Sequence, residues 1–260
     1  MEDPATSAVR LGGFSLRVWQ KGNGRKLGFL AGFGGLPRWV PFLDDLAGSR
    51  TLVVPSLPGF PGGARAHTLL DTHLDWVLAV RELLDGAGLR GADLAGSSVG
   101  ASLAAEIAAI WPESVRKLAL IAPFGIFDEA DPPADPWAQR ADNLPGLMCV
   151  NPEAWKQLKA MPEGADPIEW PIEQTRANEA AARIFWPLGD TRLAKRLRLI
   201  EADTLLIWGE HDRVMPRSYA DRFATGIAGR TQIAIIPEAG HLAELDQPDA
   251  VASAILRWME

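Results

Sequence analysis

The fold of this chain is decided by residues 92–100, with the sequence Ala-Asp-Leu-Ala-Gly-Ser-Ser-Val-Gly. The apolar stretch 92–95 predicts a short buried strand, and the five residues after it fit the pattern Gly-x-Ser-x-Gly, with Ser98 in the middle. A helix is predicted directly afterwards, because apolar residues recur at spacings of four, four and three: Val99, Leu103, Ile107 and Ile110. The sequence therefore predicts a strand, a very tight turn and a helix in immediate succession.

The tight turn gives Ser98 a special environment. Its backbone is expected to be strained, and small residues are needed at 96 and 100 because strand and helix nearly touch there. The Ser98 hydroxyl would stand at the carboxyl edge of the sheet, above the N–H groups and partial positive charge that begin the helix. A small-residue turn between any strand and helix could match the pattern, but the flanking elements favour an exposed nucleophile. Ser97 is out of register and is expected to pack locally.

Length, charge and cysteine content narrow the class of protein. The 260 residues suit one large domain, or one domain carrying an insertion. A net charge of −7 argues against general binding to nucleic acid or to an anionic membrane. Cys149 is the only cysteine, so an internal disulfide is excluded and a cytoplasmic location is favoured. The Cys149 thiol is expected to be unreactive and partly buried. The acidic start, residues 1–4, is not expected to be a secretory signal.

Strands and helices alternate on both sides of Ser98. Two short segments, 8–11 and 14–19, flank Gly12-Gly13 and predict a hairpin. Buried strands are expected at 27–30, 50–56, 92–95, 117–121, 204–208 and 232–236, and helices at 36–46, 72–84, 99–110, 217–225 and from 248. This alternation predicts an α/β fold with a largely parallel sheet covered by helices on both faces.

The alternation stops between residues 128 and 198. This stretch has no convincing buried strand, is rich in proline, and contains four of the ten tryptophans: Trp137, Trp155, Trp170 and Trp186. Such an aromatic segment is not a disordered linker. We expect a helical cap whose apolar side closes over something.

Three polar residues follow strands in the order serine, aspartate, histidine: Ser98, Asp212 and His241. A serine hydroxyl becomes a good nucleophile when an imidazole takes its proton, and an acid then fixes the imidazole. Asp212 could simply cap the next helix, and Glu210, Asp203 and Asp128 are alternative acids. The other histidines have no partner pattern, and His67, in a loop, is expected to be solvated. No cluster of His, Cys and carboxylates has metal-ligand spacing, so no metal or other cofactor is expected.

Three motifs resemble those of the α/β-hydrolase fold superfamily at its usual spacing: residues 96–100, residues 208–216 (Trp-Gly-Glu-His-Asp-Arg-Val-Met-Pro) and residues 240–242 (Gly-His-Leu). The resemblance spans essentially the whole chain. It implies a mostly parallel eight-stranded sheet flanked by helices, with a core of residues 1–127 and 199–260 and an inserted helical cap at 128–198. It also implies Ser98 as nucleophile, His241 as general base and Asp212 as the orienting acid.

The loop after the third strand departs from the family's pattern. The family commonly has His-Gly-x-Gly there, whereas this chain has Ala31-Gly32-Phe33-Gly34. The oxyanion hole is expected to use the backbone N–H groups of Val99 and of Phe33, with Gly34 as an alternative to Phe33. The substrate pocket is expected to include Gly32, Gly34, Trp137, Trp155 and Trp186.

The expected function is that of a carboxylesterase-like serine hydrolase acting on a small, largely apolar acyl substrate through an acyl-enzyme. Ser98 at the elbow, in place of the aspartate of dehalogenases and epoxide hydrolases, points to acyl chemistry. A carbon–carbon bond hydrolase of the meta-cleavage type and a peroxide-using variant are alternatives within the fold. A non-catalytic ligand receptor is the alternative of another class. We expect a monomer or homodimer with no nucleic-acid or membrane partner.

Overall fold

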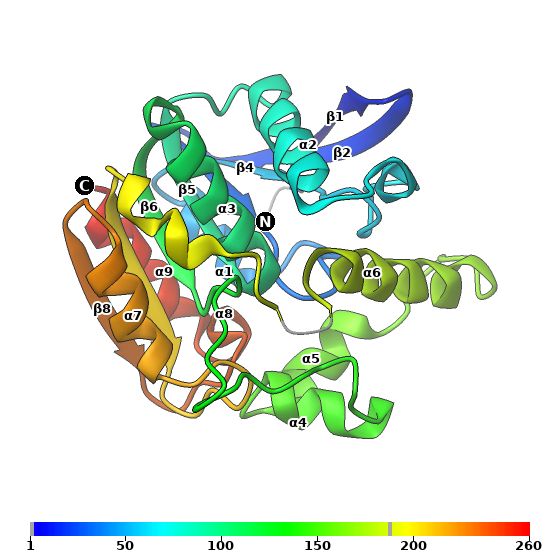
Figure 1. The fold of residues 1–260 in the computed structure, drawn as a ribbon. Helices are drawn as coiled ribbons and strands as arrows, with labels where there is room; N and C mark the ends of the chain where they lie inside the picture. The colour runs from blue at the N-terminus through cyan, green and yellow to red at the C-terminus, as the bar shows by residue number, and fades with distance from the viewer. Residues whose placement is uncertain (1–2, 187–188) are drawn as a thin grey trace.

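An eight-stranded sheet forms the centre of the protein in the computed structural model, which describes residues 3–186 and 189–260 (Figure 1). Its strand order is β1-β2-β4-β3-β5-β6-β7-β8. The β1–β2 hairpin and the β2–β4 pair are antiparallel, and all other pairs are parallel, as predicted. The strands are β1 Ala5–Leu11, β2 Phe14–Lys21, β3 Lys26–Leu30, β4 Thr51–Pro55, β5 Ala92–Ser97, β6 Val115–Ile121, β7 Asp203–Gly209 and β8 Thr231–Ile236.

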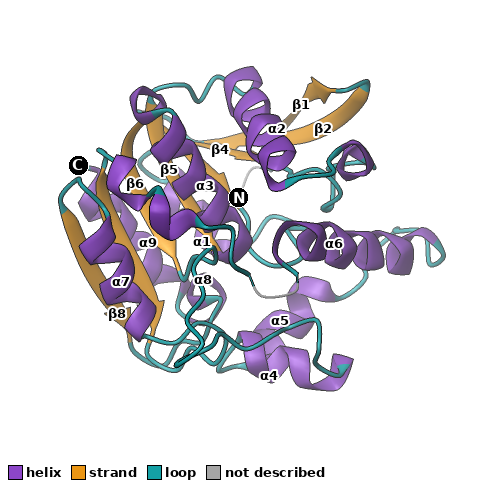
Figure 2. Cartoon of the chain, in the orientation of Figure 1, coloured by secondary structure: helices purple, strands orange, loops and turns teal. Residues whose placement is uncertain are grey.

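Helices cover both faces of this sheet, as the alternating pattern predicted (Figure 2). Their apolar residues form two buried clusters: α2 (His73–Gly86), α3 (Ser98–Ile110) and α7 (Ser218–Gly226) contribute to one, α1 (Pro41–Ala47) and α9 (Pro248–Met259) to the other. The capping box of α2 is present, with the Thr72 hydroxyl accepting from the Asp75 N–H and the Asp75 carboxylate accepting from the Thr72 N–H. None of the described helices is both long and apolar enough to cross a bilayer.

The first helix is shorter than the predicted span of 36–46. It begins at Pro41, and Val40 before it is extended, with φ −122° and ψ 154°. The residue preceding a proline is pushed out of the helical region by the proline ring, whereas proline itself suits the first helical turn. Pro41 therefore starts the helix and leaves 36–40 as an irregular connection.

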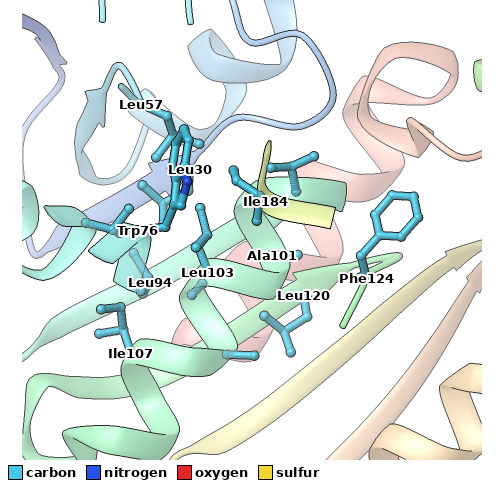
Figure 3. Close-up of a cluster of buried hydrophobic side chains, with 14 of the residues drawn as sticks. Leu30, Leu57, Trp76, Leu94, Ala101, Leu103, Ile107, Leu120, Phe124 and Ile184 are labelled. Atoms are coloured by element: carbon cyan, nitrogen blue, oxygen red, sulfur yellow. The ribbon is translucent and has the colours of Figure 1, made fainter. Parts of the chain in front are cut away.

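Residues 128–198, hereafter the insertion, lie between β6 and β7 in the chain and contain helices and turns but no strand among the residues that the structure describes. Ala177, Ala181 and Ile184 are buried in the same cluster as Leu30 and Ala101 of the sheet and of α3, so the insertion has no separate core (Figure 3). The limits at 128 and 198 stay a prediction, and residues 187–188 lie outside the described residues. Its helices are α4 Leu144–Met148, α5 Pro152–Lys159 and α6 Glu169–Phe185, with 3₁₀ turns at Ala141–Asn143, Leu193–Lys195 and Leu197–Leu199.

Candidate active site

Ser98 occupies the turn between β5 and α3. Its φ is +51°, in the left-handed region that residues other than glycine seldom adopt, so the expected backbone strain is present. A Cβ on Gly96 would lie 2.7 Å from the Gly100 carbonyl carbon, and one on Gly100 would collide with the Leu30 and Ala31 carbonyl oxygens. Both glycines are therefore required by the close approach of strand, turn and helix.

The structure brings Ser98, His241 and Asp212 together from three strand ends. His241 Nε2 lies 2.8 Å from Ser98 Oγ, and His241 Nδ1 lies 3.1 Å from Asp212 Oδ2. All three side chains are shielded from solvent. This line of contacts has the geometry in which an imidazole can take the serine proton while a carboxylate orients it.

Asp212 is held rigidly at the end of β7. Its Oδ1 accepts from the N–H groups of Val214 and Met215, at 2.8 and 2.9 Å, which leaves Oδ2 facing His241. A Cβ on Gly209 would collide with the Gly240 carbonyl oxygen, so the turns after β7 and β8 pack directly on one another.

The alternative acids lie elsewhere and have other partners. The Asp128 carboxylate pairs with Arg222, and that of Asp203 with Arg230 at 3.1 Å. Glu210 is exposed at the surface beside His211. Asp212 is the acid that the geometry supports.

The loop 31–35 lies beside the elbow. The Gly32 carbonyl accepts from the Gly35 N–H at 2.9 Å, a turn whose own hydrogen bond does not use the N–H groups of Phe33 and Gly34. Val99 is in the first turn of α3, where N–H groups have no intrahelical partner. A Cβ on Gly32 would lie 2.9 Å from Ser97 Oγ, so Gly32 serves close packing more directly than it lines a pocket.

Two of the three tryptophans expected at the pocket lie against this loop. The Phe33 ring is 5.4 Å from the Trp137 ring and 6.1 Å from the Trp155 ring. Trp186 is 63% exposed, so its expected place in the pocket is wrong. The physical reason is that α6 turns Ala177, Ala181 and Ile184 inward and ends at Phe185, and Trp186 follows it with an extended backbone, at φ −71° and ψ 139°.

Sequence reasoning missed Phe124 and Lys159. The Phe124 ring lies edge-on to His241 with 5.6 Å between ring centres, and its place just after β6 was an available signal. Lys159 Nζ donates to the Gly34 carbonyl at 2.8 Å and stands 5.0 Å from the Trp155 ring centre. Burial lowers the pKa of Lys159 to about 7. No local sequence pattern could pair Lys159 with Gly34, because the two residues are far apart in the chain.

The site is closed. Ser98 and His241 have no exposed surface. A cavity of about 190 Å³ adjoins the site through Phe124, with Phe127, Trp137, Gly189 and prolines 132, 133 and 136 in its wall. A larger cleft of about 730 Å³ lies between residues 65–68 and α6 and is lined by charges of both signs. The walls of both spaces lack the triad residues, but Phe124, in the wall of the smaller one, contacts His241. The chemistry-bearing residues, and not cavity size, therefore locate the candidate active site.

The other histidines lie outside this site. His67 is 2% exposed, so the expectation that it is solvated is wrong: it packs beneath α6, with Nε2 3.6 Å from a Glu179 oxygen, and burial lowers its pKa. His73 Nε2 lies 3.1 Å from Oε1 of the buried Glu106. Three residues, His211, Glu210 and Glu238, have potential ligand atoms within 4.8 Å of one another. All three are exposed, and exposed acidic groups commonly lie together without binding an ion.

Comparison with known proteins finds relatives that include an acetyltransferase component and two hydrolases. The chain is 26% identical to the dihydrolipoyllysine-residue acetyltransferase component of an acetoin cleaving system from Pseudomonas putida, over 99% of this chain and 70% of that one. It is 24% identical to carboxylesterase YbfK from Bacillus subtilis, over 83% and 69%. It is also 24% identical to 2-hydroxy-6-oxo-2,4-heptadienoate hydrolase from Pseudomonas putida, over 92% and 90%.

A structural match and a family match point to the same fold as these relatives. The structure of 2-hydroxy-6-oxo-6-phenylhexa-2,4-dienoate hydrolase from Rhodococcus sp. strain RHA1 matches with a TM-score of 0.76 and 19% identity, over 98% of both chains. A model described as the alpha/beta hydrolase family matches residues 29–254. Because this match covers most of the chain, the protein belongs to the alpha/beta hydrolase family.

Proposed function

We propose that the protein is a serine hydrolase that cleaves a carboxylic ester, or a related acyl bond, of a small and largely apolar molecule. The observation that carries the proposal is the buried line from Ser98 Oγ through His241 to Asp212, with gaps of 2.8 and 3.1 Å. Relatedness to a carboxylesterase supports it. No metal or other cofactor is needed for the steps below.

The proposed reaction has two halves. Ser98 Oγ attacks the substrate carbonyl as His241 Nε2 takes its proton, and the N–H groups of Val99 and Phe33 stabilise the oxyanion. The carbon–oxygen bond to the alcohol then breaks, and the alcohol leaves with the proton from His241. Water, deprotonated by His241, attacks the acyl-enzyme and releases the acid. Since His241 must be neutral to accept a proton, activity is expected to fall on the acid side.

Aromatic side chains near the proposed site support a neutral substrate that carries an aromatic ring. The Phe124 ring contacts His241, and the rings of Trp137 and Trp155 pack on Phe33 of the proposed oxyanion loop. A cavity of about 150 Å³ is enough to hold benzene, so the cavity of about 190 Å³ beside Phe124 has room for an aromatic ring of the substrate, while the reacting carbonyl lies outside it at Ser98. Asp135 also lines that cavity and disfavours an anionic group there.

Fluorophosphonate labelling followed by an ester series tests the proposal. Wild-type protein should be labelled at Ser98 and should hydrolyse phenyl or benzyl esters. Ser98→Ala should abolish labelling and lower kcat/KM by several orders of magnitude with the fold retained, because only the nucleophile is removed. Ser97→Ala is the matched control and should cost far less. Labelling without turnover of any ester would favour a receptor that kept the triad.

A carbon–carbon bond hydrolase is the second candidate. One relative acts on a dienoate by name and matches this chain almost end to end. Lys159, whose Nζ lies on the Gly34 carbonyl, is a cation below its pKa of about 7 and in that form attracts a carboxylate. Turnover of 2-hydroxy-6-oxo-2,4-heptadienoate at a higher kcat/KM than any ester would make this the primary activity. Lys159→Met should then impair the dienoate more than a neutral ester.

A further inference from the structure

The loop that carries His241 is joined to the insertion by a single carboxylate. Asp246 Oδ2 accepts from the Gly240 N–H at 2.8 Å and from the Val150 N–H at 2.8 Å. Its Oδ1 accepts from the Asn151 N–H at 3.0 Å. One side chain therefore serves two segments about ninety residues apart in the chain.

Backbone contacts reinforce the same junction. The Leu242 N–H donates to the Met148 carbonyl at 2.9 Å. A Cβ on Gly240 would lie 3.1 Å from Cys149 Cα, tighter than most side-chain contacts, so the two backbones run against each other. Residues 148–151 and 240–242 form one packed unit, and Asp246 supplies its charge-assisted hydrogen bonds.

The proposed chemistry does not use this carboxylate. Asp246 lies in α8 (Ala243–Asp246), the short helical turn that follows His241, and acts on the histidine through the N–H of Gly240, the residue before it. A carboxylate needed only to cap its own turn would not have to accept two N–H groups from the insertion. The shared acceptor makes the position of His241 depend on how residues 150–151 are seated.

We propose that Asp246 is a positioning residue that latches the α4–α5 part of the insertion onto the histidine loop and holds His241 in line between Ser98 and Asp212. This inference rests on the proposed function. A misplacement of about 1 Å at a catalytic group can cost on the order of a hundredfold in rate.

Asp246→Ala and Asp246→Asn, compared with wild type, test the latch. Asp246→Ala should lower kcat about 10- to 100-fold with KM within about threefold, since the loss is of alignment and not of substrate contacts. Asp246→Asn keeps one carbonyl acceptor and should give an intermediate kcat. Asp221→Ala and Asp221→Asn, at an exposed position on α7, are the matched controls and should leave kcat unchanged.

Two readouts separate positioning from a merely structural role. The acid limb of the kcat profile should move further in Asp246→Ala than in Asp246→Asn. Both variants lose the charge that, besides burial, raises the pKa of Glu244 and of Cys149, but only Asp246→Ala loses every side-chain acceptor that holds the histidine loop. Amide exchange at Gly240, Val150 and Asn151 should accelerate together. Wild-type kcat and pH profile in a folded Asp246→Ala protein would overturn the inference.

Two further outcomes are decisive. If Asp246→Ala does not fold, wild-type kcat in Asp246→Asn would overturn the inference equally. Failure of wild-type protein to react with a fluorophosphonate would instead reject the proposed function itself.

Discussion

At the scale of single residues, Gly100 shows how little room the elbow has. A Cβ there would collide with two backbone carbonyl oxygens, which cannot move as a flexible side chain can. Gly100→Ala is therefore expected to destabilise the protein by about 1–3 kcal/mol or more, and to slow fluorophosphonate labelling by displacing Ser98. Gly146→Ala is the control, since nothing lies within 4 Å of a Cβ there and its helix should tolerate it. Thermal melts and labelling rates check both; equal melts would refute the steric account.

Glu244, also a single residue, predicts a pH-dependent stability. The side chain is 6% exposed, and burial raises its pKa from 4.5 to about 7. The folded protein therefore holds the Glu244 proton up to a higher pH than the unfolded chain does. The stabilisation that this protonated carboxyl gives the folded state is complete below about pH 4.5 and is lost as pH rises towards 7. Glu244→Gln removes the ionisation, so its stability relative to wild type should rise by on the order of 3 kcal/mol across that window.

Urea unfolding of Glu244→Gln between pH 4.5 and 8 is the measurement. The exposed Glu201→Gln serves as control and should show no such trend. If the free energies of unfolding of wild type and Glu244→Gln differ by a constant amount across the whole pH range, Glu244 ionises normally in the folded state.

At the scale of elements, the strand, turn and helix around Ser98 could be predicted because their signals are local. Periodicity located the sheet, and short motifs after three strands pointed to Ser98, Asp212 and His241. The start of α1 was missed because Pro41 overrides the apolar pattern before it. Trp186 was misplaced because composition does not show that α6 ends at Phe185 and leaves the next residue extended and exposed. Lys159 and Asp246 act across long separations, which only the folded chain brings together.

The insertion's elements should set substrate preference. Trp137 lies against Phe33 beside the elbow, so Trp137→Ala enlarges the space next to the proposed oxyanion loop. It should reorder kcat/KM among esters of different size, by about 1–3 kcal/mol between the best and worst affected. Trp186→Ala is the matched control, since that side chain is 63% exposed. If the ratios of kcat/KM among the esters were the same in Trp137→Ala as in wild type, the insertion would cover the site without a role in specificity.

At the scale of the whole molecule, the insertion and the sheet share one apolar cluster, so they are expected to unfold together (Figure 3). Ile184 of α6 is 6% exposed within that cluster, and Ile184→Ala should lower the free energy of unfolding by about 2–5 kcal/mol. Ile172, on the same helix, is 50% exposed, and Ile172→Ala should change stability by less than about 0.5 kcal/mol. Urea unfolding followed by tryptophan fluorescence and by far-ultraviolet circular dichroism measures both variants. One coincident transition is expected, because Ile184 is buried in the same cluster as residues of the sheet and of α3. Two separated transitions, with Ile184→Ala shifting only the first, would show that the insertion is an independent unit that opens without the core.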